Sequence, residues 1–270
     1  MKDYIRQIVA NVEDNILARC VAREYLQARI LESVQGHGAF STWAFVGGTA
    51  LRFLYSMPRF SEVLDFSLVK AGDSDGFLEL MQEAKSRFES EGYQLSIKAK
   101  TENAVKSAFI KFSGLLYEVG LSPHRSETTS IKVEIDTNPP AGAGLETSIV
   151  RKHVLLNLQH YDKSSLLAGK LHALLSRRYV KGRDVYDLMW YLSDRSWPGP
   201  NIVLLNNALA QSGWKGGQIT AETWKENVIE AVSKYDWQKV IADLRPFVEK
   251  RQELEILTKD NLMKLLKSHD

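Results

Sequence analysis

The sequence is poor in cysteine, because Cys20 is the only one among its 270 residues. A single thiol cannot form a disulfide within the chain, so a packed core has to hold the fold together, and a chain of this length can bury one. No secretory leader precedes the first helical segment. We therefore expect a protein of the reducing cytoplasm.

Long apolar runs and a strong net charge are also missing. No stretch approaches the roughly 18 uninterrupted apolar residues of a membrane span, so we expect no membrane partner. The net charge of +2 is too small to identify a nucleic-acid-binding protein by itself. P-loop, Cys-x-x-Cys and Gly-x-Ser-x-Gly motifs are absent from the sequence, which argues against the enzyme classes that those motifs mark.

Basic residues nevertheless gather in two places. Such clusters usually form a solvated surface, although a local basic patch can also contact nucleotide or RNA phosphates. The clusters are Arg151, Lys152 and His153, and Arg177, Arg178, Lys181 and Arg183.

Apolar periodicity divides the chain into a mixed half and a helical half. The spacing over residues 3–35 predicts one long helix, and the pattern from residue 164 onward is helical almost to the end, with a last helix over 236–268. A short apolar run predicts a buried strand at 42–46. Alternation predicts strands at 62–69, 93–100, 108–112, 115–121 and 130–137. We therefore expect an α/β (α+β) fold, with a mixed sheet flanked by helices in residues 1–160 and a helical C-terminal domain in residues 161–270.

A glycine pair, Gly47-Gly48, ends the apolar run at 42–46 and precedes a helical segment that begins near Thr49. Glycines allow the backbone to approach a phosphate, and a helix N-terminus offers N–H groups and positive dipole charge to it. The strand that follows places Val63 and Asp65 on one face. Two carboxylates at such positions can share divalent metal ions that bridge to a nucleoside triphosphate.

This segment resembles the first motif of the AbiEii/AbiGii-type toxins of the nucleotidyltransferase superfamily. The resemblance rests on Gly47-Gly48-Thr49-Ala50-Leu51 and on Arg59-Phe60-Ser61-Glu62-Val63-Leu64-Asp65-Phe66. The family pattern is Gly-Gly-Thr-Ala-Leu, then Arg-x-Ser, then Asp-Leu-Asp-Phe, so Val63 stands where the first catalytic Asp belongs. Glu62 is a poor substitute because it faces the other side of the strand.

Valine cannot ligate a metal, and loss of even an outer group commonly costs 10–100-fold in metal affinity or activity. We therefore expect an intact fold with weakened chemistry, produced either by natural divergence or by deliberate inactivation of a toxic protein.

Three later segments also follow the family pattern. A strand carries Lys132, Glu134 and Asp136 on one face, a helix carries Lys170, and Arg183-Asp184-Val185-Tyr186-Asp187-Leu188 opens another helix. From sequence pattern alone, these are a half-exposed strand, a surface lysine and a salt-bridged helix start. The resemblance implies that Glu134 is the third acidic residue, that Lys170 faces the triphosphate and that Asp187 is catalytic. The family usually has a neutral polar residue where Asp136 stands, so this extra carboxylate is a candidate to replace in part the one missing at Val63.

The resemblance implies a toxin of a toxin–antitoxin or abortive-infection (phage-defence) system, neutralised by an antitoxin encoded nearby. It would transfer NMP from an NTP to RNA, with a tRNA 3′ end as one candidate acceptor. Asp65 and Glu134 would hold Mg²⁺. Gly47, Gly48, Thr49, Ser61 and Arg183 would bind the nucleotide, and Arg177, Arg178 and Lys181 would lie near RNA.

Two alternatives stay open. One alternative to transfer to RNA is a non-catalytic nucleotide- or RNA-binding module on the same scaffold, and the other is a transferase that acts on a protein or small molecule.

Overall fold

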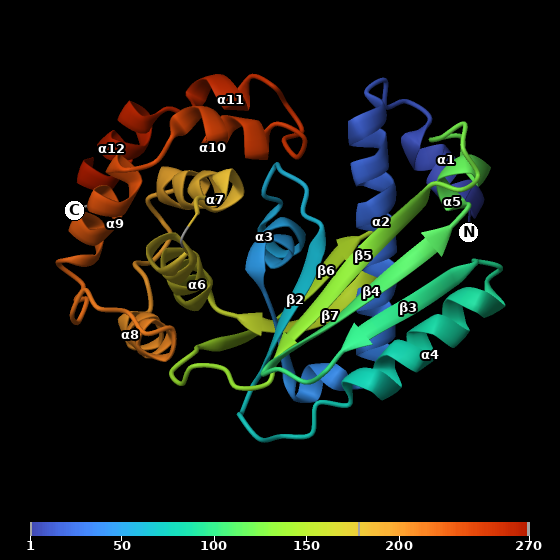
Figure 1. Cartoon of the computed structure of the whole chain (residues 1–270), viewed down its shortest axis with the longest axis horizontal. Helices are drawn as coiled ribbons and strands as arrows, with labels where there is room; N and C mark the ends of the chain where they lie inside the picture. The colour runs from blue at the N-terminus through green and yellow to red at the C-terminus, as the bar shows by residue number, and fades with distance from the viewer. Residues whose placement is uncertain (1, 178, 269–270) are drawn as a thin grey trace. The chain divides into compact units, whose positions relative to one another are not determined.

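The computed structural model describes residues 2–177 and 179–268 (Figure 1). The chain divides into two compact units. The first consists of residues 1–56, 60–139 and 147–160, and the second of residues 57–59, 140–146 and 161–270. Among the described helices, none combines the length and the apolar character that crossing a membrane requires.

A mixed sheet of seven strands forms the first unit, in the order β3-β4-β5-β2-β1-β7-β6. Its strands are β1 (Trp43–Val46), β2 (Val63–Leu68), β3 (Leu95–Lys100), β4 (Val105–Ser113), β5 (Thr128–Asp136), β6 (Leu145–Lys152) and β7 (Val154–Tyr161). The central strand β2 pairs with β1 in antiparallel and with β5 in parallel orientation. Segments distant in the sequence therefore meet along β2.

The two faces of this sheet differ in chemistry. Leu64 and Phe66 of β2 and Ile131, Val133 and Ile135 of β5 are almost completely buried. Helices α2 (Asn15–Gly36) and α4 (Phe77–Ser90) contact β5 and β3 respectively and each other, and cover this apolar face. Because side chains alternate along a strand, the polar side chains of β2 and β5 share the opposite face.

The remaining helices of the first unit are α1 (Lys2–Val9), α3 (Gly47–Tyr55), α5 (Leu115–Glu118) and the short 3₁₀ helix η1 (Ala39–Ser41). The prediction of one helix over 3–35 is wrong, since the chain breaks at Asp14, whose Oδ1 accepts a hydrogen bond from Ile16 N at 2.8 Å and begins α2. The predicted strand over 115–121 is also wrong. Gly114, with φ 69°, turns the chain into α5 instead.

The second unit is helical. It contains α6 (Lys163–Ser176), α7 (Gly182–Ser193), α8 (Ile202–Gln211), α9 (Trp224–Ser233), α10 (Trp237–Leu244), α11 (Glu253–Ile256) and α12 (Lys259–Ser268). A single helix over 236–268 was expected, and three are present. Pro246 lies in the first interruption, and its ring removes the backbone N–H that an α-helix needs.

Candidate active site

Asp65 and Glu134 are neighbours across the β2–β5 pair. The parallel register aligns Asp65 with Glu134 and Val63 with Lys132. Paired residues on adjacent strands, about 4.8 Å apart, point to the same face. The sheet thus brings together two of the carboxylates that the sequence predicts for the site, and it places the Val63 side chain beside them.

Lys132 forms an ion pair with Glu134, with 2.6 Å between Nζ and Oε1. This ammonium belongs to the same strand face and lies in register with Val63. A cation at this distance competes with a metal ion for Glu134. The sequence analysis assigned Lys132 to the motif but did not predict this ion pair. The one available signal was the alternation along β5, which places Lys132 and Glu134 on the same face.

Asp136 continues the acidic face of β5 and is aligned with Ser67 of β2. Its Oδ1 accepts a hydrogen bond from the backbone N–H of Asn138 at 2.9 Å. Burial nevertheless raises the pKa of the Asp136 carboxyl above its usual value. Asp136 is two positions beyond Glu134, whereas Val63 is aligned with Lys132, so the register gives Asp136 no place next to position 63.

The glycine turn touches the carboxylate of Asp65. Gly47 has φ +80°, and a Cβ added there would lie 2.5 Å from Asp65 Oδ2. Only glycine therefore permits the first turn of α3 to approach this carboxylate. The N-terminus of α3 has no side-chain cap, and the first N–H groups of a helix lack partners within it. Gly47, Gly48 and Thr49 supply these groups.

The side chain of Thr49 has a structural role. It is completely buried, and its hydroxyl donates to the carbonyl oxygen of Val63. This bond fastens α3 to β2, so the contribution left to Thr49 in ligand binding is its backbone N–H. Ser61 accepts a hydrogen bond at its backbone oxygen from Gln27 Nε2, at 3.0 Å.

Two carboxylates suit one Mg²⁺ that arrives with a nucleotide, because Mg²⁺ is commonly held by one or two carboxylates and substrate phosphates. Asp65 and Glu134 meet that requirement. Among the described residues, no group of three or more acidic, histidine or cysteine side chains could hold a metal ion. Val63, on the same strand face, offers no oxygen ligand in addition to these two carboxylates.

A buried ion-pair network occupies the second unit. Lys170 Nζ of α6 lies 2.6 Å from Asp187 Oδ2 and 3.1 Å from Asp184 Oδ1 of α7. Arg59 donates two hydrogen bonds to the carboxylate of Asp187, from Nε to Oδ1 and from Nη2 to Oδ2, each 2.5 Å long. Burial tends to lower the pKa of Lys170, but the charges of Asp187 and Asp184 outweigh it and raise the pKa. Lys170 is therefore held as an ammonium.

Asp187 is fully buried and Arg59 nearly so. With its oxygens bound to Arg59 and Lys170, Asp187 is arranged to orient the lysine rather than to accept a proton. Sequence reasoning gave Arg59 no role. The available signal was its place in the Arg-x-Ser part of the first motif.

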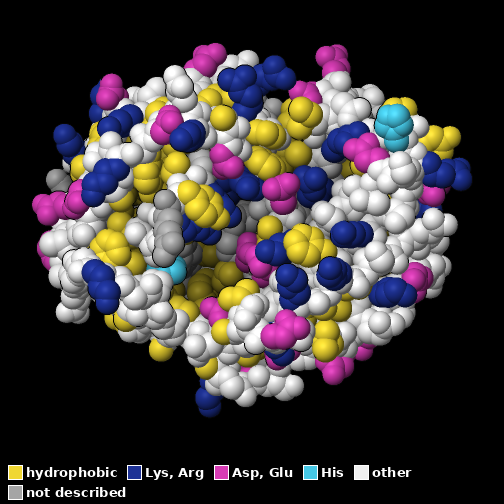
Figure 2. All heavy atoms as spheres, in the orientation of Figure 1, with side chains coloured by type: hydrophobic (Ala, Val, Ile, Leu, Met, Phe, Trp, Pro, Cys, Tyr) yellow, Lys and Arg dark blue, Asp and Glu magenta, His cyan; other side chains and the backbone are white. Residues whose placement is uncertain are grey.

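The basic cluster before α7 is divided among several partners. Arg177 pairs with Asp184. The Arg183 guanidinium carbon lies 4.3 Å from the centre of the Phe247 ring, and its Nε lies 3.7 Å from Asp243 Oδ2. Lys181 is the residue at the N-cap of α7, and Arg178 lies outside the described residues. On the surface shown in Figure 2, Lys and Arg side chains are interspersed with Asp and Glu rather than gathered in one patch.

Comparison with known proteins gives a family and a fold. The family described as nucleotidyl transferase AbiEii toxin, type IV TA system, matches residues 29–260. A Helicobacter pylori protein described as a nucleotidyltransferase is similar with a TM-score of 0.55 at 17% identity, covering 92% of this chain and 93% of that chain. JHP933 from Helicobacter pylori gives 0.54 at 17% identity, with 92% and 90% covered.

The nucleotidyltransferase toxin MenT4 from Mycobacterium tuberculosis gives a TM-score of 0.47 at 18% identity, with 96% of this chain and 98% of that chain covered. A search of curated proteins returned no match. The likeness to the two Helicobacter structures confirms the mixed α/β fold predicted from the sequence.

Proposed function

This chain belongs to the AbiEii family of nucleotidyltransferase toxins of type IV toxin–antitoxin systems, and from that premise we propose that it transfers a nucleoside monophosphate from an NTP to RNA, in a reaction weakened by Val63. The observation that carries the proposal is the alignment of Asp65 with Glu134 beside the Gly47 turn. An acidic pair next to a helix N-terminus offers oxygen ligands to a cation and N–H donors to phosphate.

Each residue of the acidic face has a proposed role. The first-turn N–H groups at Gly47, Gly48 and Thr49 bind phosphate oxygens of the NTP, and Ser61 contributes a further polar contact. Asp65 and Glu134 would hold the Mg²⁺ of the nucleotide and would activate the attacking hydroxyl of the acceptor. Mg²⁺, when bound, neutralises charge that develops on the phosphates.

In the helical unit, Lys170 neutralises negative charge on the leaving pyrophosphate. Asp187 and Arg59 position its ammonium through the contacts at 2.6 and 2.5 Å. Arg183 contributes to nucleotide binding, and Arg177, Arg178 and Lys181 contribute to RNA binding. In this proposal the helical domain, residues 161–270, completes the active site of the core in residues 1–160.

Two features of the described structure support the proposed weakening of the reaction. Position 63 offers no oxygen ligand, and Lys132 competes for Glu134 at 2.6 Å. Loss of one ligand costs at least the 10–100-fold observed for outer groups. An aspartate at position 63 would stand in register with Lys132 and could draw its ammonium away from Glu134.

The family membership supports the proposed acceptor and partner. RNA is the proposed acceptor, with a tRNA 3′ end as the first to test, and a cognate antitoxin is the proposed partner. The biological setting would be a cytoplasmic toxin–antitoxin or abortive-infection system.

A paired labelling assay tests the proposal. The parent chain, Val63→Asp and Val63→Asn are incubated with total RNA, Mg²⁺ and each NTP labelled at its α-phosphate. Val63→Asn matches aspartate in size but supplies no charge. The proposal predicts that Val63→Asp labels RNA at least tenfold faster than the parent or Val63→Asn, and that ribonuclease removes the label. Labelled product that resists ribonuclease would instead identify a protein or small-molecule acceptor.

The same missing ligand at Val63, together with the Lys132–Glu134 pair, favours a second candidate, a non-catalytic nucleotide- or RNA-binding module. This module would bind RNA without labelling it in any of the three variants. The absence of labelling by Val63→Asp, with RNA binding retained, would select it.

A further inference from the structure

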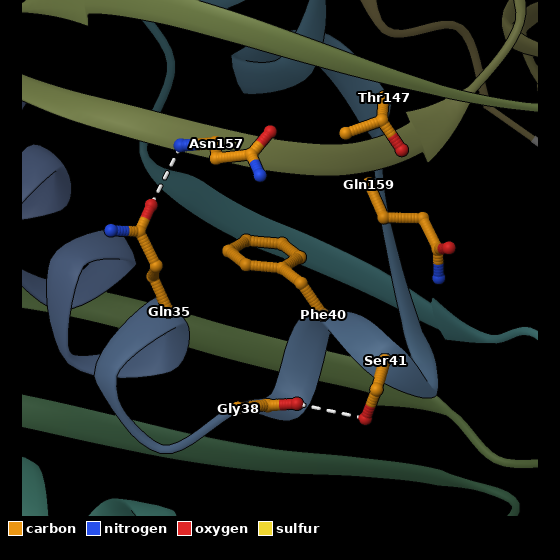
Figure 3. Close-up of a pocket in the computed structure, with 7 residues that line it drawn as sticks. All are labelled: Gln35, Gly38, Phe40, Ser41, Thr147, Asn157 and Gln159. Carbon is orange, nitrogen blue, oxygen red and sulfur yellow. Dashed lines mark hydrogen bonds between the residues drawn. The ribbon is translucent and has the colours of Figure 1, made fainter.

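A pocket of about 460 Å³ lies in the first unit, at the end of α2 and beside β7 (Figure 3). Its volume falls in the range of small-molecule sites, about 300–1,000 Å³. The side chains that line it are Gln35, Phe40, Ser41, Thr147, Asn157 and Gln159. None of these belongs to the acidic face, and none has a role in the proposed transfer.

The lining is uncharged and polar around one aromatic ring. Three carboxamides and two hydroxyls surround Phe40, whose ring is only partly buried. In Figure 3 the ring lies between Gln35 on one side and Gln159 on the other, with Asn157 above it near Gln35. The ring of Phe66 supports it, with 6.2 Å between the centroids. A flat group that enters the pocket can therefore stack on Phe40 while its edge meets amide groups.

Hydrogen bonds fix several of these amides and leave others available. Gln35 Oε1 accepts from the backbone N–H of Asn157 at 2.6 Å, and Gln159 Nε2 donates to the carbonyl oxygen of Trp43 at 3.2 Å. The side-chain amide of Asn157 and the hydroxyl of Thr147 make no hydrogen bond to the described part of the protein. The two hydrogen bonds orient the amides of Gln35 and Gln159, whereas Asn157 and Thr147 add a polar amide and a hydroxyl that no hydrogen bond to the described residues fixes.

We propose that this pocket binds an unstacked nucleobase. A nucleobase is planar and uncharged, it stacks on aromatic side chains, and Asn and Gln amides match the donors and acceptors on its edges. A charged ligand would find no counter-charge among the lining residues. The pocket also lies near Trp43 at the start of β1, whereas the Gly47 turn follows its end, roughly 10 Å away at 3.3 Å per residue. The proposed base is therefore not the one on the transferred nucleotide.

The neighbouring surface suggests where the phosphates of such a ligand run. Thr147, Ile149 and Arg151 share one face of β6, because side chains alternate along a strand. Arg151 is exposed and makes no ion pair with the described residues. It lies roughly 13 Å along the strand from Thr147, within reach of the backbone of a short single strand. A base of the RNA acceptor fits this arrangement, and to that extent the inference rests on the proposed function. A free nucleotide offers the same base chemistry.

The test measures binding of the full chain in the absence of NTP and Mg²⁺. One ligand is a fluorescent, unstructured RNA of mixed sequence, and the other is a strand of equal length with abasic sites in place of the bases. Both strands carry the same phosphate charge, so the difference in affinity reports base recognition. We expect the parent to prefer the RNA about tenfold, Phe40→Ala to lose most of that preference, and Phe40→Tyr to keep it.

Two further variants keep the result interpretable. Asn157→Leu changes an exposed side chain of similar size and should also reduce the preference, even if Phe40→Ala disturbs folding. Tyr117→Ala removes an exposed aromatic ring that does not line the pocket, and it should bind like the parent. Displacement of RNA by nucleoside 5′-monophosphates from the parent would identify a free nucleotide as a sufficient ligand, whereas no displacement would point to the RNA strand.

Equal affinity of the parent for the two strands, or an unchanged preference in both Phe40→Ala and Asn157→Leu, would overturn the inference. No nucleotide is transferred in this measurement, so its outcome is separate from that of the labelling assay. RNA labelling without a base preference would support the proposed nucleotide transfer and contradict nucleobase binding in the pocket. A base preference that depends on Phe40, without labelling, would support nucleobase binding and contradict the proposed transfer.

Discussion

At the scale of single residues, the buried carboxylate of Asp187 compensates two cations. Its oxygens lie 2.5 Å from Arg59 nitrogens and 2.6 Å from Lys170 Nζ. Asp187→Asn leaves both cations with less compensation, and breaking a buried pair in this way typically costs about 3–5 kcal/mol. Urea unfolding should show a loss of that order.

Glu230→Gln provides the matched control for Asp187→Asn. It breaks the ion pair of Glu230 with Lys234, whose side chains are 72% and 68% exposed, and such exposed pairs contribute little to stability. Equal losses in the two variants would show that the Arg59–Asp187–Lys170 network contributes no more than a surface pair.

Gly47 carries a second prediction at this scale. Gly47→Ala places a Cβ 2.5 Å from Asp65 Oδ2 and requires an L side chain at φ +80°. The strained backbone costs about 1–2 kcal/mol, and the displaced carboxylate should remove most of the labelling activity of a Val63→Asp background. Thermal unfolding and initial labelling rates measure the two effects.

Gly169→Ala is the corresponding control, since a Cβ at this helical position meets no atom within 4 Å. Replacing a glycine inside a helix should stabilise the protein by up to about 1 kcal/mol and leave labelling unchanged. Full activity in the Gly47→Ala variant would contradict the role given to the turn.

Single residues also mark the limit of sequence reasoning. The alternation of Val63 with Asp65, and of Lys132 with Glu134, follows from the strand pattern and predicts which side chains share a face. The sequence does not contain the pairing of β2 with β5, so it could not show that Lys132 stands opposite Val63 or that Arg59 binds Asp187. Those contacts depend on residues far apart in the chain.

At the scale of elements, α7 packs closely on α10 because of Gly182. A Cβ at Gly182 would lie 1.9 Å from the carbonyl oxygen of Val240. Gly182→Ala therefore forces the two helices apart, at a cost of about 1–3 kcal/mol for an overpacked contact. Chemical denaturation measures this loss, and Gly199→Ala, whose Cβ meets nothing within 4 Å, should lose much less. Comparable stability of the two variants would contradict the close α7–α10 contact.

The sequence predicted element boundaries where the local pattern is strong, and it missed boundaries that are set by a capping residue. The strands at 42–46 and 62–69 are present as β1 and β2, because their alternating or buried patterns are clear. The helix expected over 3–35 ignored the capping side chain of Asp14, and apolar spacing alone continues through such a break. The residues at 115–121 have an alternating pattern, but the positive φ of Gly114 is visible only in the backbone.

At the scale of the whole molecule, buried acidic groups make stability depend on pH. Burial tends to raise the pKa of Asp184, but Lys170 and Arg177 outweigh it and lower the pKa. Burial likewise tends to raise the pKa of Glu24, but the hydrogen bond from His153 and the charge of Arg52 outweigh it and lower the pKa. A carboxyl whose pKa is lower in the folded chain adds stability above its unfolded pKa, and this stability is lost as the pH falls through the folded value.

The free energy of unfolding should therefore be constant near neutral pH and fall steadily below about pH 4. Denaturant titrations at pH 7, 5 and 3 measure it. Asp184→Asn should be less stable than the parent at pH 7 and should show a shallower decline on acidification. A parent as stable at pH 3 as at pH 7 would contradict this assignment of the buried pairs.

The measurement that tests the central claim most directly is the single-turnover rate of RNA labelling by Val63→Asp and by the double variant Val63→Asp/Asp65→Asn. The account predicts that the first substitution raises the rate at least tenfold over the parent, and that the second, on the same face of β2, returns it to the parent's level or below. A Val63→Asp chain no faster than the parent, or a double variant as fast as the single one, would contradict the claim that these strand positions carry the chemistry.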